Sequence, residues 1–328
     1  MTGVATGRRR RGEQPMVPEA EFASYYGRPV LNPPVWKAYD IAGYFFLGGL
    51  AGASSALAAG AELTGRHRLA RNARVGALGA IGLSVAALIH DLGRPARFVN
   101  MLRVAKPTSP MSVGSWILAV YGPLAGGAAA SAVTGLVPRL GTLAGLGAAV
   151  TGPAVAGYTA ALICDTAVPA WHEGYREMPF VFVGSAALAA GGLGLLTTPT
   201  GETGPARSLA ITGACAELTA LALMRRRLGM LAEPYRTGKG GRRLRVAQAL
   251  TVAGLATAAL GRRDRVWSAL AGGMLLAASA ATRFGVFEAG MDSARDPKYT
   301  VQPQRDRLSR RSGGVAAEVG EQEVGRVR

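Results

Sequence analysis

Long apolar runs, separated by short charged or Pro- and Gly-containing segments, dominate the pattern of hydrophobic and polar positions. Each run is roughly 17–25 residues long, which is the length that an α-helix needs to cross a hydrocarbon core of about 30 Å. Runs bounded in this way predict eight transmembrane helices, at 39–63, 73–90, 112–136, 140–165, 178–197, 207–225, 245–261 and 265–284. The pattern therefore predicts an all-α polytopic membrane protein.

Composition and charge agree with a membrane protein. Charged residues make up 17% of the 328 residues, against about 25% in an average soluble protein. Gly, Ala, Ser and Thr fill the apolar runs, as in helices that pack closely in lipid. The net charge of +17 comes from arginines in tails and loops, where they set topology, so we expect no nucleic-acid partner.

Three regions follow from this pattern. A polar N-terminal tail (1–38) precedes the transmembrane domain (39–284), and a polar C-terminal tail (285–328) follows it. The outer part of the C-terminal tail has no apolar periodicity, so it is expected to be disordered.

The loop charges predict the orientation. An even number of spans puts both termini on one side of the membrane. The loops on that side carry thirteen Lys and Arg residues against nine on the opposite side, and the tails add more. The positive-inside rule therefore predicts a plasma-membrane protein with both termini in the cytoplasm.

Polar side chains gather at the membrane boundary nearest the termini. They open the first predicted span, close the second and lie within the boundary turns of the third and fourth. Tyr158 and Asp165 are seven residues apart, so they share one helix face. Such a group could hydrogen-bond and protonate a quinone that enters from lipid, although each residue alone also fits a helix stop or an interfacial belt. The residues are Tyr39, Asp40, His90, Asp91, Trp116, Tyr158 and Asp165.

Glu217 lies near the middle of the apolar run 207–225. A charge at mid-membrane costs at least about 2.5–3.5 kcal/mol, so it is usually functional or paired. We predict a proton path or a buried pair at Glu217; the alternative is a side chain that faces lipid or snorkels to the surface.

Cofactors bound by the chain itself are not expected. The three histidines, His67, His90 and His172, do not place two ligands at one depth in the membrane, as a haem b would require. No CxxC motif offers an iron–sulfur site, and Cys164 and Cys215 lie inside apolar runs as small packing residues. We therefore predict no metal, haem or iron–sulfur cluster in this chain.

Three stretches resemble the NrfD/PsrC family, the integral membrane subunits of polysulfide reductases and related complexes. They are "YDIAGYFFLGGLAGASS", "HDLGRPARFVNMLRVAKPTSPMSVGSWIL" and "GYTAALICDTAVPAWHEGYREMPFVFVGSA". The second is long and specific, and matches the family's D-L-G-R-P and S-P-M elements. Together the three cover roughly residues 39–190.

The resemblance implies two four-helix halves, 39–165 and 178–284, of which the first holds a quinone (menaquinone or ubiquinone) near the membrane surface. Asp91 and Arg94 match the D-L-G-R-P element, and Tyr158 matches the family tyrosine that faces the quinone. Tyr39, Asp40 and His90 are assigned to the quinone site only because they lie close to these motif residues.

The resemblance also implies partners. An iron–sulfur electron-transfer subunit would dock at the quinone half, with a molybdopterin oxidoreductase, such as formate dehydrogenase or polysulfide reductase, beyond it. The chain would then be a membrane anchor in a respiratory complex and not an enzyme by itself. In the family's best-known type the soluble partners lie outside the cytoplasm, whereas the charge bias here predicts an inward-facing catalytic arm.

A secondary transporter or proton-translocating subunit is the alternative, because the apolar runs are interrupted by Gly and Pro and contain a carboxylate. A transporter would gather its polar groups at the midplane. Most polar groups of this chain gather at one edge, which favours the quinone-binding subunit.

Overall fold

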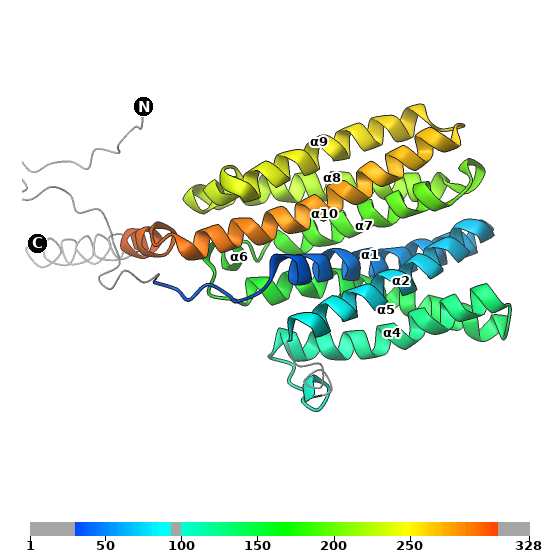
Figure 1. Cartoon of the computed structure of the whole chain (residues 1–328), viewed down its shortest axis with the longest axis horizontal. Coiled ribbons are helices and arrows are strands. Elements are labelled where there is room, and N and C mark those ends of the chain that lie inside the picture. The colour runs from blue at the N-terminus through cyan, green and yellow to red at the C-terminus, as the bar shows by residue number, and fades with distance from the viewer. Residues whose placement is uncertain (1–29, 93–99, 308–328) are drawn as a thin grey trace, which may run out of the picture.

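The computed structural model describes residues 30–92 and 100–307. All regular structure in these residues is helical, and the long helices lie side by side along one axis with their turns at two opposite ends (Figure 1). The predicted class, an all-α polytopic membrane protein, is confirmed.

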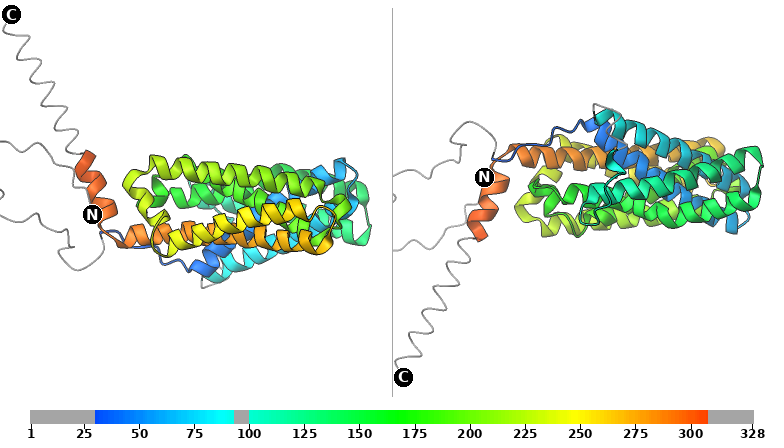
Figure 2. Two further views of the ribbon diagram at one scale, coloured as in Figure 1. Left: turned by 90° about the horizontal axis from the view of Figure 1, so that it is seen from above. Right: turned by 90° about the horizontal axis from the view of Figure 1, so that it is seen from below.

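Eight long helices and three short ones are named within the described residues. The long helices are α1 (Ala38–Leu63), α2 (His67–Asp91), α4 (Pro110–Thr134), α5 (Pro138–Cys164), α7 (Met178–Thr197), α8 (Gly204–Arg227), α9 (Gly238–Leu260) and α10 (Arg265–Arg295). The short ones are α6 (Pro169–His172), η1 (Thr200–Glu202) and η2 (Gly229–Tyr235). Residues 298–307 are also helical, and they turn away from the axis of α10 (Figure 2).

Seven of the long helices in the described part are long and apolar enough to cross a membrane. The remaining one, α9, is 23 residues long but carries Arg242, Arg243 and Arg245 in its first turns. The count of eight spans and the division into two four-helix bundles therefore stay predictions.

Consecutive long helices run in opposite directions, so the bundle has two ends. The terminal face holds the starts of α1, α4, α7 and α9 and the ends of α2, α5, α8 and α10. The distal face, at the other end, holds the remaining turns.

Helix α1 is the centre of the packing. It contacts α2 and α5 on one side and α7 and α10 on the other. Of the residues in its most apolar stretch, 78% are buried inside the protein. Its contact with α5 is a backbone-to-backbone approach, because a Cβ on Gly52 would lie 3.3 Å from the Cα of Gly152 and overlap its carbonyl. Small residues thus allow the close packing that lipid-embedded helices need.

Three predicted helix boundaries, the starts of α2 and α9 and the end of α10, were wrong by about two to three turns. Helix α2 begins at His67 and not at 73, because the Glu202 carboxylate accepts hydrogen bonds from the backbone N–H groups of Arg68 and Leu69 and so caps its first turn. Helix α9 begins at Gly238, before the predicted 245.

Helix α10 continues beyond the predicted end at residue 284 to Arg295. Its last turns are buried by α6: the Trp171 indole donates to the carbonyl of Val286, and the Ser293 hydroxyl accepts from the backbone of Ala170. The first part of the predicted polar tail is therefore helix.

Candidate functional site

A cavity of about 100 Å³ lies between α1, α2, α4 and α5 close to the terminal face. Most of its lining is apolar, with one carboxylate and two tyrosines among the lining residues. The lining residues are Trp36, Ile41, Tyr44, Leu88, Asp91, Leu92, Met101, Met111, Gly114, Ser115, Leu118, Tyr158 and Leu162. An apolar pocket with a few polar groups is the usual form of a site for a small amphipathic molecule.

Two predicted site residues, Asp91 and Tyr158, line this cavity together. Tyr158 comes from the last turns of α5, and its buried hydroxyl has no hydrogen-bond partner among the described residues. Leaving a buried hydroxyl unpaired costs about 1–3 kcal/mol, so a ligand that accepts this hydrogen bond would recover that energy. Asp91 ends α2 and accepts a hydrogen bond of 3.3 Å from the backbone N–H of Lys37.

Gly114 makes room for the Tyr158 ring. A Cβ on Gly114 would lie 2.7 Å from Cδ2 of Tyr158 and 3.0 Å from its Cζ, and would overlap Cε2. The rings of Tyr44 and Tyr158 pack edge to face, with 6.4 Å between centroids. The position of the Tyr158 hydroxyl is therefore fixed by α1 and α4 as well as by its own helix.

Asp40 and His90 form a pair beside the cavity and do not line it. Nδ1 of His90 lies 2.9 Å from the Asp40 carboxylate, with the His90 side chain 69% exposed. Tyr39 is 80% exposed and contacts Phe284 of α10, also outside the lining. The structure brings Asp40 and His90 together at the surface but leaves Tyr39 apart.

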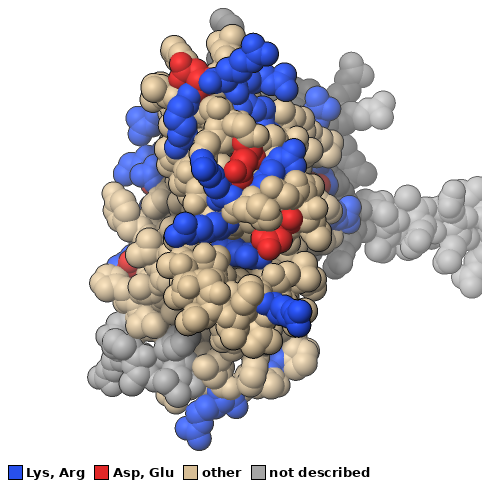
Figure 3. Space-filling view, turned by 90° about the vertical axis from the view of Figure 1, so that its right-hand side faces the viewer, with Lys and Arg blue, Asp and Glu red and all other residues tan. Residues whose placement is uncertain are grey.

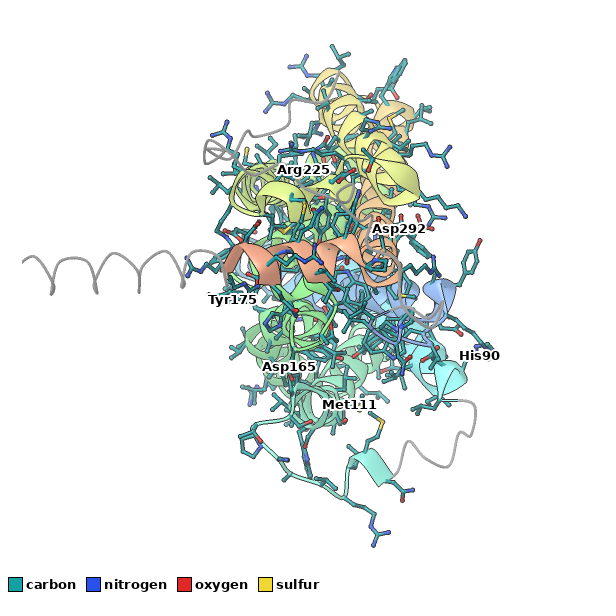
Figure 4. The ribbon with its side chains drawn as sticks, turned by 90° about the vertical axis from the view of Figure 1, so that its left-hand side faces the viewer. His90, Met111, Asp165, Tyr175, Arg225 and Asp292 are labelled. Atoms are coloured by element: carbon teal, nitrogen blue, oxygen red, sulfur yellow. The ribbon has the colours of Figure 1, made fainter. Side chains whose placement is uncertain are left out.

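Asp165 lies in a different place. It is exposed at the end of α5 and lines a second, more polar pocket with His172, Tyr299 and Arg307. Figure 4 looks onto the terminal face, where His90, Met111 and Asp165 lie. Arg94 falls outside the described residues, so its predicted role stays a prediction.

Sequence reasoning missed Tyr44 and Trp36. Tyr44 belongs to the quoted stretch "YDIAGYFF", one helical turn after Asp40, and so shares a face with it. Trp36 precedes α1 and stacks on Trp171, with ring centroids 6.0 Å apart. The spacing could have identified Tyr44, whereas the Trp36–Trp171 contact depends on the tertiary fold.

Two charged residues, Glu217 and Arg283, are buried inside the bundle, within α8 and α10. Glu217 of α8 is 2% exposed, and one carboxylate oxygen accepts a 2.5 Å hydrogen bond from Thr282 while the other has no partner in the described residues. Arg283 of α10 is 1% exposed and donates to the carbonyl of Phe182, with its guanidinium 3.9 Å from the centre of the Phe182 ring.

Arg283 acts electrostatically on Glu217 without a direct hydrogen bond. Its Nε and Nη1 have no partner among the described residues. Glu217 was predicted as a buried polar residue, and Arg283 was missed. The unpaired N–H groups of Arg283 and the unpaired oxygen of Glu217 are the kind of buried groups that an internal water bridges.

An ion pair between Arg227 and Glu177 joins the end of α8 to the start of α7 at the terminal face. Arg227 donates to both carboxylate oxygens of Glu177 at 2.7 and 2.6 Å, and these hydrogen bonds hold the pKa of Glu177 below its ordinary value. This ion pair holds the end of α8 against the start of α7.

A comparison with known families identifies the family of this chain. The family model described as polysulphide reductase, NrfD, matches residues 29–200, which is more than half of the chain and includes every cavity residue. No curated protein matches the sequence. The chain therefore belongs to the NrfD family and is a multi-pass membrane subunit of a redox complex.

Proposed function

We propose that this chain is the quinone-binding membrane anchor of a respiratory complex. Electrons would pass between the membrane quinone pool and an iron–sulfur subunit docked on the terminal face, with a molybdopterin oxidoreductase beyond it. The single observation that supports this most is the apolar cavity lined by Asp91 of α2 and by Tyr158 of α5, whose buried hydroxyl has no partner among the described residues.

The cavity residues suit a quinone headgroup. A bound quinone supplies the redox chemistry, taking up two electrons and two protons. The Tyr158 hydroxyl would donate a hydrogen bond to one carbonyl oxygen, while Leu88, Leu118 and Leu162 exclude water from the ring. Asp91, which also lines the cavity, would hold or release a proton.

The Asp40–His90 pair would exchange protons with water. The His90 side chain is exposed on the terminal face, and Asp91 follows it in α2. Histidine is a common proton shuttle in proteins. Protons could thus reach Asp91 from the surface without crossing the membrane.

The test measures quinone reduction by the purified native complex, and the quinone that can be extracted from it, for Tyr158→Phe and Asp91→Asn. Loss of the tyrosine hydrogen bond should lower turnover about tenfold or more. Matched variants on the same face, Tyr175→Phe and Asp292→Asn, should keep full turnover because neither residue lines the cavity. Unchanged turnover and quinone content in both cavity variants would count against the site. Tyr39→Phe and Asp165→Asn in the same assay decide whether those residues take part.

We also propose that both termini, and the docked partners, lie on the cytoplasmic side of the plasma membrane, following the charge bias of the loops. A fluorescent protein fused after residue 328 should fold and fluoresce, while alkaline phosphatase fused there should be inactive. An active phosphatase fusion would reverse the orientation and place the partners outside.

A second candidate function is proton transfer through the second half of the chain. It is favoured by one observation: the carboxylate of Glu217 is buried near Arg283, and one of its two oxygens has no hydrogen-bond partner among the described residues. A transporter would also use such a midplane group. The cavity near the terminal face supports the quinone function over a transporter.

A further inference from the structure

Five basic side chains form an exposed ridge where α8, η2 and α9 meet the terminal face. We call Arg226, Arg236, Lys239, Arg242 and Arg245 the basic ridge; all five are exposed. Arg236 and Arg245 each donate one hydrogen bond to a backbone carbonyl. Most of their N–H groups therefore remain available to an external anion.

The acidic residues around the ridge are already paired. Glu177 binds Arg227, Glu288 binds Arg243 and Glu233 binds Lys298, at 2.6–3.1 Å. Among the described residues, no carboxylate forms an ion pair with a ridge residue. The ridge thus carries a local excess of positive charge that the chain itself does not neutralise.

Apolar side chains lie next to the ridge on the outward faces of the same helices. Leu223 is 51% exposed on α8, one turn before Arg226. On α9, Val246 is 52% and Val252 62% exposed, and Val246 follows Arg242 by one turn. Helix α8 packs chiefly on α7, and α9 on α10, so within this chain these outward faces have few neighbours.

We propose that the basic ridge binds the phosphate groups of anionic phospholipids in the leaflet at the terminal face. Guanidinium groups bind phosphate through paired hydrogen bonds, and basic clusters beside membrane helices attract anionic lipid. The exposed Leu223, Val246 and Val252 would contact the acyl chains of the same lipids. An acidic protein partner would account for the cations but not for the apolar side chains next to them.

The distal face provides a contrast. Lys and Arg side chains are visible there too (Figure 3), but several are engaged: Arg74 pairs with Glu62, and Arg265 donates to the carbonyls of Leu195 and Leu196. The exposed Arg71, Arg139 and Arg263 lie near the start of α2, at the start of α5 and in the turn between α9 and α10. They offer a charge-matched control.

The experiment uses the full chain, stripped of native lipid and exchanged into bilayer discs of phosphatidylcholine with a minor share of phosphatidylglycerol. Native mass spectrometry then counts the lipids of each class retained per protein. The triple variant Arg226→Gln/Arg242→Gln/Arg245→Gln should lose phosphatidylglycerol retention about tenfold or more. Phosphatidylcholine retention should not change.

The control variant Arg71→Gln/Arg139→Gln/Arg263→Gln removes the same charge and should retain phosphatidylglycerol as the original chain does. Equal retention by both triple variants would overturn the proposal. Displacement of the lipid by millimolar inorganic phosphate alone would also overturn it, because a free anion would then satisfy the ridge. Co-purification of the partner subunits tests the alternative. If the ridge variant keeps its lipid but loses a subunit, the ridge is a protein interface.

Discussion

Gly114→Ala is expected to reduce quinone reduction by the native complex about tenfold to a hundredfold. The added methyl group would lie 2.7 Å from Cδ2 of Tyr158 and must push the ring away from α4. Tyr44 also packs against that ring, with 6.4 Å between centroids, so a displaced phenol must shift against Tyr44 and carry its hydroxyl with it. Displacement of a positioned group by about 1 Å is enough for a loss of this size.

Gly122→Ala is the matched control on the same helix, because a Cβ at Gly122 meets nothing within 4 Å. It should leave turnover, bound quinone and complex assembly unchanged. Both variants are checked for helix content and for co-purification of the partner subunits. Full activity of an assembled Gly114→Ala complex would show that the position of Tyr158 is not critical. Equal losses in both variants would indicate a general effect on α4.

The helices themselves were predictable because apolar length is encoded locally. Their ends were not, since the ends depend on residues far away in the sequence. The first turn of α2 is capped by Glu202, 134 residues from Arg68, and the last turns of α10 are buried by Trp171 and Ala170. Hydropathy alone contains no information on such contacts.

The lining of the cavity was predictable in part. Asp91 and Tyr158 were identified by a motif and they share the cavity. Asp165 was placed with Tyr158 because the two are seven residues apart, but α5 ends at Cys164 and the chain leaves the helical register there. Asp165 therefore lines another pocket. Gly114 was invisible to a search for chemically active groups, because its contribution is the absence of a side chain.

Arg283 was missed for a related reason. The predicted span ended at residue 284, which would place Arg283 at the membrane surface, where arginine is ordinary. In the structure α10 runs on to Arg295, so that Arg283 lies inside the helix and is 1% exposed. It is close to α1 as well, because a Cβ on Gly49 would lie 3.1 Å from Nη2 of Arg283. The buried guanidinium thus lies where α1, α7 and α10 meet.

Arg283→Met should destabilise the chain by about 3–5 kcal/mol, the usual cost of leaving a buried charge without its compensating partner. The variant leaves Glu217 buried with one oxygen unpaired and without the nearby cation that acts on it. Unfolding of the purified chain in mixed micelles, followed by circular dichroism, measures the change. Arg295→Met, in an exposed pair with Asp292, is the control and should cost at most about 1 kcal/mol.

The double variant Glu217→Gln/Arg283→Met separates charge from packing. If the two residues are coupled by charge, the neutral amide should restore most of the stability lost in Arg283→Met; additive losses would mean that they act independently. Glu217→Gln alone then tests the proton path. Its complex, reconstituted in vesicles, should reduce quinone at the original rate while the pH change across the vesicle membrane falls. If that pH change stays the same, the pair stabilises the contact of α7, α8 and α10 and carries no protons, and the cavity at the terminal face accounts for all proton exchange with the quinone.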